Sequence, residues 1–466
     1  MTTNQSFYPV LVWVHGGGLK SGCSSQSIPI LYNGTNIISS LIEQNQTAAI
    51  VVTINYRLGV FGDMYLNELV EENRSEWPTA GNYFYLDMIS ALRWINKNII
   101  DYGGDPKNVL LFGESSGGNA VIDIGALKGS SNLYQRAISQ SGGAGNYIYY
   151  TNISNALRAS KEVAQNVNCT TFTDKQTLLS CLRNASIQDL LTAYGYRQTQ
   201  PIIDNYFFPY YPPLAIENDQ YNKNLNLVIG NNDYEFTFCL DSPDMNSTDM
   251  ITILNGVLGE KWTSKIVDYF QINQCSSNRT AVNRCCDLLR IVIGYRNFDC
   301  NVQRIYNKLY SKYNQRTNLF WYHLDCNPGI CPQLTEEEGA GICAHTTEIP
   351  YVFGTASSYN SDTALNCSWD DQSKRFSNQI ILHWINTAKT GKPLDSWLSY
   401  DPSNLEYFYI RPYANFSNVN WNGNCQVFDQ IEKEYVSLMF PEANHSSFHR
   451  NANIILYFFI IFLLLK

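Results

Sequence analysis

Short apolar runs of strand length recur along the chain, separated by longer stretches of mixed polarity. Uninterrupted runs of this kind lie at residues 9–14, 108–112, 225–230 and 318–324. Such runs are typical of strands in a mostly parallel sheet that is covered on both faces. The pattern predicts alternating strands and helices from residue 9 to about 150, a more helical region to about 220, and alternation again beyond it.

The most informative motif directly follows one of these runs. Residues 113–117 read Gly-Glu-Ser-Ser-Gly, which fits the pattern G-x-S-x-G, and a stretch able to open a helix begins at Gly118. A serine on a sharp turn from strand to helix has its hydroxyl pushed out beyond the sheet, and small neighbours make that turn possible. The pattern therefore predicts a nucleophile at Ser115.

A nucleophilic serine needs donors for the oxyanion, a base, and a carboxylate that orients the base. The run at 9–14 leads into His15 and three glycines. Glycines let the backbone pass close to a substrate and turn its N–H groups inward. We expect Gly17, Gly18 and the N–H of Ser116 to form an oxyanion hole.

The base can be found by elimination, because the chain has six histidines. Five are set aside: His15 in the glycine loop, His323 in a strand run, His383 in a helical stretch at 379–385, and His445 and His449 near the C-terminus. The remaining histidine, His345, follows a Gly-Ala-Gly loop. In one known chain order of such triads the histidine comes last, so His345 is the expected base.

The carboxylate should lie between the serine and the histidine in sequence. Asp233 and Glu235 both come just beyond the strand run at 225–230, where a triad acid would sit. Position in the sequence alone does not decide whether Asp233 or Glu235 is the triad acid.

These residues resemble a known family, the type-B carboxylesterases and lipases, which include the cholinesterases. The likeness spans about residues 9–437 and includes further stretches at 51–59, 82–118, 136–142, 201–204 and 387–393. It implies an α/β-hydrolase fold, in which helices cover both faces of a central, mostly parallel sheet.

The resemblance also implies roles for single residues. Ser115 would be the nucleophile, Glu235 the acid and His345 the base, because the runs at 234–238 and 345–349 resemble the family's motifs. Glu114, which precedes the nucleophile, and Ser141, in the run at 136–142, would be supporting residues. No cofactor or metal is implied.

The chain departs from the family pattern at three places. Ser116 replaces an alanine, which leaves the backbone donor intact. Phe236 replaces a glycine, and a positive φ there would strain a phenylalanine. The family also has more chain before the glycine loop, so we expect an incomplete gene model that lacks about the first 100 residues and leaves strand edges unpaired.

Thirteen cysteines and twelve N-x-S/T sites indicate a glycosylated protein of an oxidising compartment. The resemblance implies two disulfides, Cys169–Cys181 and Cys300–Cys425. Cys326 and Cys331 flank a Pro-Gly turn, and we expect them to form a small local bridge. Residues 1–6 are no signal peptide, which again favours an incomplete N-terminus.

Length and charge narrow the class of protein. A chain of 466 residues with 44% apolar side chains can bury a full core, so we expect one hydrolase domain at 1–440. The net charge of −9 argues against nucleic acid and anionic membrane surfaces as partners. Residues 441–466 read as a polar spacer and a hydrophobic tail, which suits a removable signal for a GPI anchor.

Together these features predict a secreted or cell-surface serine hydrolase that acts on a small carboxylic ester through an acyl-enzyme. The alternatives are a non-catalytic, cholinesterase-like adhesion or recognition protein, and a lipase for long-chain acyl esters. Adhesion members of the family typically lose a triad residue, whereas all three are present in this chain. Which ester is the substrate stays open.

Overall fold

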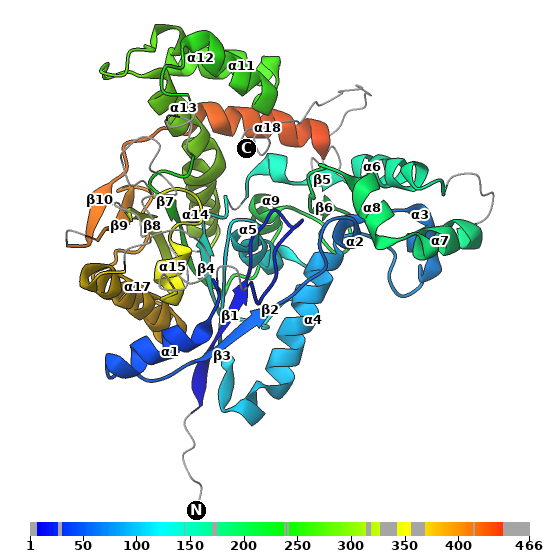
Figure 1. The fold of residues 1–466 in the computed structure, drawn as a ribbon, viewed down its shortest axis with the longest axis horizontal. Coiled ribbons are helices and arrows are strands. Elements are labelled where there is room, and N and C mark those ends of the chain that lie inside the picture. The colour runs from blue at the N-terminus through cyan, green and yellow to red at the C-terminus, as the bar shows by residue number, and fades with distance from the viewer. Residues whose placement is uncertain are drawn as a thin grey trace, which may run out of the picture.

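A computed structural model gives the fold and describes residues 7–26, 30–143, 145–169, 175–236, 239, 242–313, 318–326, 343–355, 369–412 and 415–440. Within these ranges the centre is an eight-stranded sheet of order β10-β9-β8-β7-β4-β3-β1-β2 (Figure 1). Its strands are β1 (Tyr8–Val14), β2 (Ile50–Ile54), β3 (Gly104–Glu114), β4 (Arg136–Gln140), β7 (Asn226–Asn232), β8 (Leu319–Leu324), β9 (Glu406–Ile410) and β10 (Ser417–Asn420). All neighbours are parallel except β9 and β10.

Alternate side chains of the central strands enter two different cores. In β1, Val10, Val12 and Val14 pack into one core, while Leu11 and Trp13 pack into the other. Helices α4 (Tyr83–Asn98) and α5 (Ser116–Asp123) cover the first face, and α1 (Gly34–Glu43), α15 (Ile349–Phe353) and α17 (Asp371–Thr390) cover the second. Because side chains alternate along a strand, burial on both faces requires the uninterrupted apolar runs that the sequence shows.

The remaining elements lie around this sheet (Figure 1). A two-stranded sheet joins β5 (Thr151–Asn152) to β6 (Ile202–Ile203). The other helices are α2 (Val60–Asp63), α3 (Asn67–Glu72), α6 (Ile153–Asn166), α7 (Lys175–Asn184), α8 (Ile187–Tyr194), α9 (Pro212–Glu217), α11 (Ser247–Leu258), α12 (Glu260–Phe270), α13 (Cys285–Gly294), α14 (Cys300–Lys312) and α18 (Gln426–Met439). A π-helical segment, η5 (Tyr295–Asp299), joins α13 to α14.

The predicted architecture is confirmed, with one difference in the second half. The runs at 9–14, 108–112, 225–230 and 318–324 form parts of β1, β3, β7 and β8. Alternation was expected beyond residue 220, but the described chain between β7 and β8 is helical from α11 to α14. Met250, Leu254 and Val257 follow helical spacing and are buried, so this segment satisfies its apolar side chains as a helix layer.

Five disulfides join described residues: Cys169–Cys181, Cys239–Cys286, Cys275–Cys285, Cys300–Cys425 and Cys326–Cys343. The expected Cys326–Cys331 bridge is therefore wrong. Cys326 follows the end of β8, and the fold brings Cys343 to a Cα separation of 4.9 Å, within reach of a disulfide. Closeness in space, not in sequence, selects the partner. Cys331 itself lies outside the described residues.

The predicted spacer and hydrophobic tail, 441–466, also lie outside the described residues. In the parts of the chain that the structure does describe, none of the helices combines the length and the apolar character needed to cross a membrane.

Candidate active site

Ser115 occupies the sharp turn between β3 and α5. Its backbone has a φ of +57° and a ψ of −126°, and its N–H donates to the carbonyl oxygen of Gln140 at 2.9 Å. A non-glycine residue rarely adopts this conformation, which the surrounding structure must enforce. Gly117 makes the turn possible, because a Cβ there would lie 2.1 Å from the carbonyl oxygen of Val14.

The glycine loop lies against this turn and leaves its donors unused. The carbonyl of Gly16 accepts from His15 Nδ1 at 2.9 Å, and the carbonyl of Gly17 accepts from the N–H groups of Lys20 and Ser21. Since a trans peptide points its N–H opposite to its C=O, the N–H groups of Gly17 and Gly18 face away from these partners. Within the described chain, these two groups and the N–H of Ser116 donate to no protein atom.

Two further contacts hold the loop in place. The N–H of Leu19 donates to the side-chain oxygen of Ser116 at 3.1 Å. The hydroxyl of Tyr56 donates to the carbonyl of His15 at 2.6 Å, and its ring stacks on the imidazole with centroids 4.4 Å apart. The loop is thereby tied to the same turn that presents Ser115.

His345 and Glu235 meet at hydrogen-bond distance. Nδ1 of His345 lies 2.6 Å from Oε2 of Glu235. The other carboxylate oxygen, Oε1, accepts from the Ser141 hydroxyl at 2.5 Å and from the N–H of Asn232 at 2.7 Å. Both oxygens of a carboxylate that is almost fully buried are therefore satisfied, and the carboxylate is fixed in orientation.

The other imidazole nitrogen faces Glu114 rather than the serine. Nε2 of His345 lies 3.2 Å from Oε1 of Glu114. Between these described residues no hydrogen bond joins Nε2 to Ser115 Oγ. Catalytic hydrogen bonds are often absent or long without substrate and form when it binds.

Glu114 and His345 influence each other's protonation. Burial raises the pKa of Glu114 to about 8. Burial by itself lowers the pKa of His345, but the carboxylates of Glu114 and Glu235 outweigh it and raise that pKa. The two groups therefore titrate as a coupled pair.

A further carboxylate network supports the site. Glu348, 1% exposed, accepts from the side-chain amides of Asn232 at 2.8 Å and Gln140 at 3.0 Å. The indole N–H of Trp384 donates to Gln140 Oε1 at 2.9 Å. Burial raises the pKa of Glu348. Sequence reasoning assigned no role to these residues; the place of Glu348, three residues after His345, was the one available signal.

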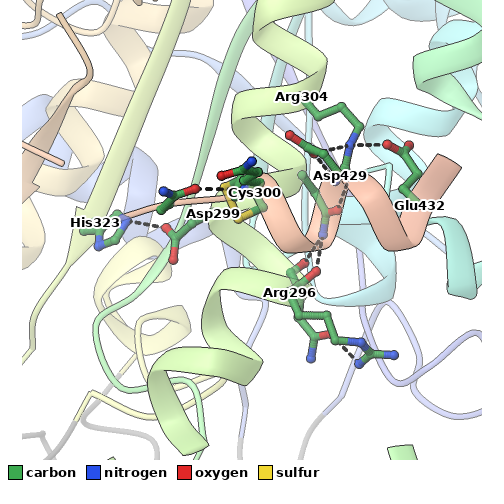
Figure 2. The surroundings of a disulfide bond; sticks show 12 residues. Arg296, Asp299, Cys300, Arg304, His323, Asp429 and Glu432 are labelled. Carbon is green, nitrogen blue, oxygen red and sulfur yellow. Dashed lines mark hydrogen bonds and ion pairs between the residues drawn. A yellow bond between two sulfur atoms is a disulfide. The ribbon is translucent and has the colours of Figure 1, made fainter. Parts of the chain in front are cut away.

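The structure also separates the two candidate acids. Asp233 contacts His323, with 3.5 Å between Oδ1 and Nδ1, and accepts from the Tyr409 hydroxyl at 2.6 Å. His323 Nε2 lies 2.8 Å from Asp299 Oδ1 (Figure 2). Of these two candidate acids, Glu235 is the one that faces His345. Phe236 does not have a positive φ, so the strain considered for that position is not present.

Among the described residues one group could resemble a metal site, formed by Cys239, Cys286 and Asp287. The two cysteines are joined in a disulfide and offer no thiolates, so this group does not fit a metal.

The mostly parallel sheet with helices on both faces, and the strand–turn–helix elbow that carries Ser115, are those of the α/β-hydrolase class. Within that class, the chain belongs to the carboxylesterase family, whose sequence model matches residues 1–428. It is 27% identical to the para-nitrobenzyl esterase of Bacillus subtilis (strain 168) over 428 residues, which cover 88% of this chain and 77% of that protein.

The chain is also similar to a neuroligin and to an acetylcholinesterase, both of which are longer proteins. Human neuroligin-3 is 26% identical over 89% of this chain, and Bungarus fasciatus acetylcholinesterase is 28% identical over 86% of it. The matches cover 46% and 65% of those two proteins, so the chain spans about half to two thirds of their length. A PNB esterase structure superimposes with a TM-score of 0.69 at 24% identity, over 92% of this chain and 82% of that one, which supports the fold.

Proposed function

We propose that this protein is a serine carboxylesterase in which Ser115, His345 and Glu235 form the triad. The observation that carries the proposal is the 2.6 Å contact between His345 Nδ1 and Glu235 Oε2, beside a serine held at a φ of +57°. The family and its esterase relatives support ester hydrolysis as the reaction.

The proposed reaction has two steps. The Ser115 hydroxyl attacks the ester carbonyl while Nε2 of His345 takes its proton, and Glu235 stabilises the imidazolium. The N–H groups of Gly17, Gly18 and Ser116 bind the oxyanion. Collapse of the tetrahedral intermediate expels the alcohol, which receives the proton from His345. Water, activated by the same imidazole, then releases the acid and restores the serine.

A non-catalytic recognition protein is the second candidate, because neuroligin-3 matches as much of this chain as the esterases do. The arrangement of Ser115, His345 and Glu235 favours catalysis over this alternative. A lipase for long acyl chains would use the same three residues and differ in the shape of its acyl pocket.

The test of the proposed function compares wild type, Ser115→Ala and Ser130→Ala on p-nitrophenyl butyrate. Ser130 is a buried serine whose hydroxyl donates to the Leu127 carbonyl, away from the site. Ser115→Ala should reduce kcat about 10⁴-fold or more, and Ser130→Ala should keep it. Unchanged turnover in Ser115→Ala would refute the triad. A wild type that neither turns over esters nor reacts with a fluorophosphonate would favour the recognition protein.

We also propose that the protein is a secreted or cell-surface protein with one hydrolase domain at 1–440 and a GPI anchor. Five disulfides among the described residues suit an oxidising compartment. Phosphatidylinositol-specific phospholipase C on intact cells should release the protein into the medium. Retained protein that still carries the peptide 454–466 by mass spectrometry would contradict the anchor.

A further inference from the structure

A disulfide lies beside the proposed base. Cys343 precedes His345 by two residues, and its sulfur is bonded to that of Cys326, the second residue after β8. Both cysteines are almost fully buried, at 1% and 0% exposed. They are 17 positions apart in sequence, so the bond joins the start of the histidine segment directly to the carboxyl end of a central strand. One end of the segment that carries the base is therefore fixed covalently.

The backbone of this segment also pairs with the segment of the proposed acid. The N–H of Tyr234 donates to the carbonyl of Cys343 at 3.2 Å, and the N–H of His345 donates to the carbonyl of Glu235 at 3.3 Å. Both distances exceed the usual N–H···O distance of about 2.9–3.0 Å. These two bonds therefore restrain the histidine segment less tightly than the covalent link does.

Thr346, directly after the base, has a backbone conformation that its side chain disfavours. Its φ is +74°, in a region that β-branched residues rarely adopt. Such a conformation persists only where the surrounding structure enforces it. On its C-terminal side, the N–H of Ile349 at the start of α15 donates to the Thr346 carbonyl at 3.2 Å. On its N-terminal side, the covalent restraint is the disulfide at Cys343.

The side chain of Thr347 connects the disulfide to the same turn. Its Oγ1 lies 3.3 Å from Cys326 Sγ and 3.7 Å from Cys343 Sγ. The hydroxyl also donates to the carbonyl of Ala344 at 2.7 Å. The two sulfur atoms therefore contact the turn at 344–347 as well as anchoring its start.

From these contacts we propose that the Cys326–Cys343 disulfide positions His345 toward Glu235, so that breaking the bond lets Thr346 relax and turns the imidazole away from the carboxylate. The disulfide is a positioning element, because it acts through His345. This inference rests on the proposed function, in which His345 is the base. It makes the esterase dependent on the oxidised form of this one bond, since two free thiols keep the chain intact but release the turn.

The first test compares wild type with two variants on p-nitrophenyl butyrate. Cys326→Ala/Cys343→Ala removes the proposed positioning bond. Cys169→Ala/Cys181→Ala removes a disulfide with a sequence separation of 12 that ends in α7, which lies well away from α15 in Figure 1. Both variants should have a lower Tm than wild type.

The two variants should differ in kcat, measured below both Tm values. Cys326→Ala/Cys343→Ala should lose about 10-fold or more, because release of backbone strain shifts an equilibrium by about this factor. Cys169→Ala/Cys181→Ala should keep the kcat of wild type. Equal kcat in the two variants would show a bond that only stabilises the fold, and would overturn the proposal.

A second measurement follows the contact between His345 and Glu235 without any turnover. The Nδ1 proton of a histidine that donates to a carboxylate gives a proton NMR signal far downfield of the backbone amides. Wild type and the control variant should show this signal, and His345→Gln should lack it. In Cys326→Ala/Cys343→Ala it should move or broaden, and an unchanged signal would overturn the proposal. If the signal responds in this way but wild type hydrolyses no ester, the proposed function fails and the positioning stands.

Reduction of folded wild type provides a test that does not require the variant to fold. Dithiothreitol transfers two electrons and two protons to the bond, closes to a cyclic disulfide and leaves two thiols, which iodoacetamide alkylates. Mass spectrometry of peptides identifies the alkylated cysteines at each reductant concentration. Loss of activity should follow alkylation of Cys326 and Cys343. Full activity in protein that is alkylated at both would contradict the proposed positioning.

Discussion

The side-chain oxygen of Ser116 accepts a hydrogen bond from the backbone N–H of Leu19, 97 residues earlier in sequence, at 3.1 Å. The bond joins the turn that presents Ser115 to the loop that carries two of the proposed oxyanion donors. The carboxylesterase family has alanine at this position. An alanine has no side-chain oxygen and cannot accept this hydrogen bond. In this chain the residue after the proposed nucleophile therefore contributes a side chain as well as a proposed backbone donor.

This contact predicts that Ser116→Ala lowers kcat about 3- to 10-fold while KM changes little, because one hydrogen bond contributes about 0.5–1.5 kcal/mol. A transition-state analogue such as a trifluoromethyl ketone should bind more weakly by the same factor. Ser130→Ala should change neither quantity. If Ser116→Ala matches wild type while Ser115→Ala is inactive, the positioning role fails and the triad stands.

The second prediction separates the two acids beyond β7. Glu235→Gln should reduce kcat by about 10³-fold or more, because the imidazole loses the carboxylate that orients it and stabilises its cation. Asp233→Asn should have a small effect on kcat, since Asp233 faces His323 and Tyr409 instead. Steady-state kinetics with p-nitrophenyl butyrate measure kcat of both variants. A greater loss of kcat in Asp233→Asn than in Glu235→Gln would contradict the assignment of Glu235 as the acid.

The third prediction concerns the pH profile. The Glu114 carboxylate raises the pKa of His345, and the neutral imidazole is the proposed base. Glu114→Gln should therefore lower that pKa and shift the acid limb of kcat/KM to lower pH, by about 1 unit or more. Glu348→Gln should shift it less, because Glu348 is the weakest of the contributing charges. An unmoved acid limb in Glu114→Gln would show that the 3.2 Å contact does not control the base.

The fourth prediction concerns stability. Burial lowers the pKa of His323, but Asp299 and Asp233 overcome this and raise it to about 9, above the unfolded value of 6.5. A raised folded pKa stabilises the protein fully below pH 6.5, and the contribution is lost as pH rises toward 9. Its size is on the order of 3 kcal/mol. In urea unfolding, the free energy of unfolding of His323→Gln should therefore fall further below that of wild type at pH 6 than at pH 9.5.

His383→Gln provides the control for that measurement. Burial lowers the pKa of His383 to about 4, so its imidazole is neutral throughout this pH range. In the unfolded chain this imidazole titrates near 6.5, so His383→Gln should lose slightly less stability against wild type at pH 6 than at pH 9.5, the opposite of the dependence expected for His323→Gln. If His323→Gln behaves in the same way, the proposed charge on His323 is wrong.

Local sequence by itself determined the parts of the site that a few adjacent residues build. The turn at 113–117 needs small residues because Gly117 approaches the Val14 carbonyl, and the glycine loop needs positive φ at Gly17 and Gly18. Alternation along the strands places neighbouring side chains in opposite cores, so apolar runs predicted the sheet. Such constraints act over neighbouring residues and are therefore readable in the order of the chain.

The tertiary structure alone decided which distant side chains meet. Asp233 and Glu235 are equivalent by position, and the path of the chain beyond β7 turns one toward His323 and the other toward His345, 110 residues away. The Cys326–Cys343 disulfide likewise joins two residues that the tertiary structure brings together. Parallel pairing of β4 with β7 and of β7 with β8 brings their carboxyl ends to one edge, and contacts there depend on side-chain direction in three dimensions, which no local pattern encodes.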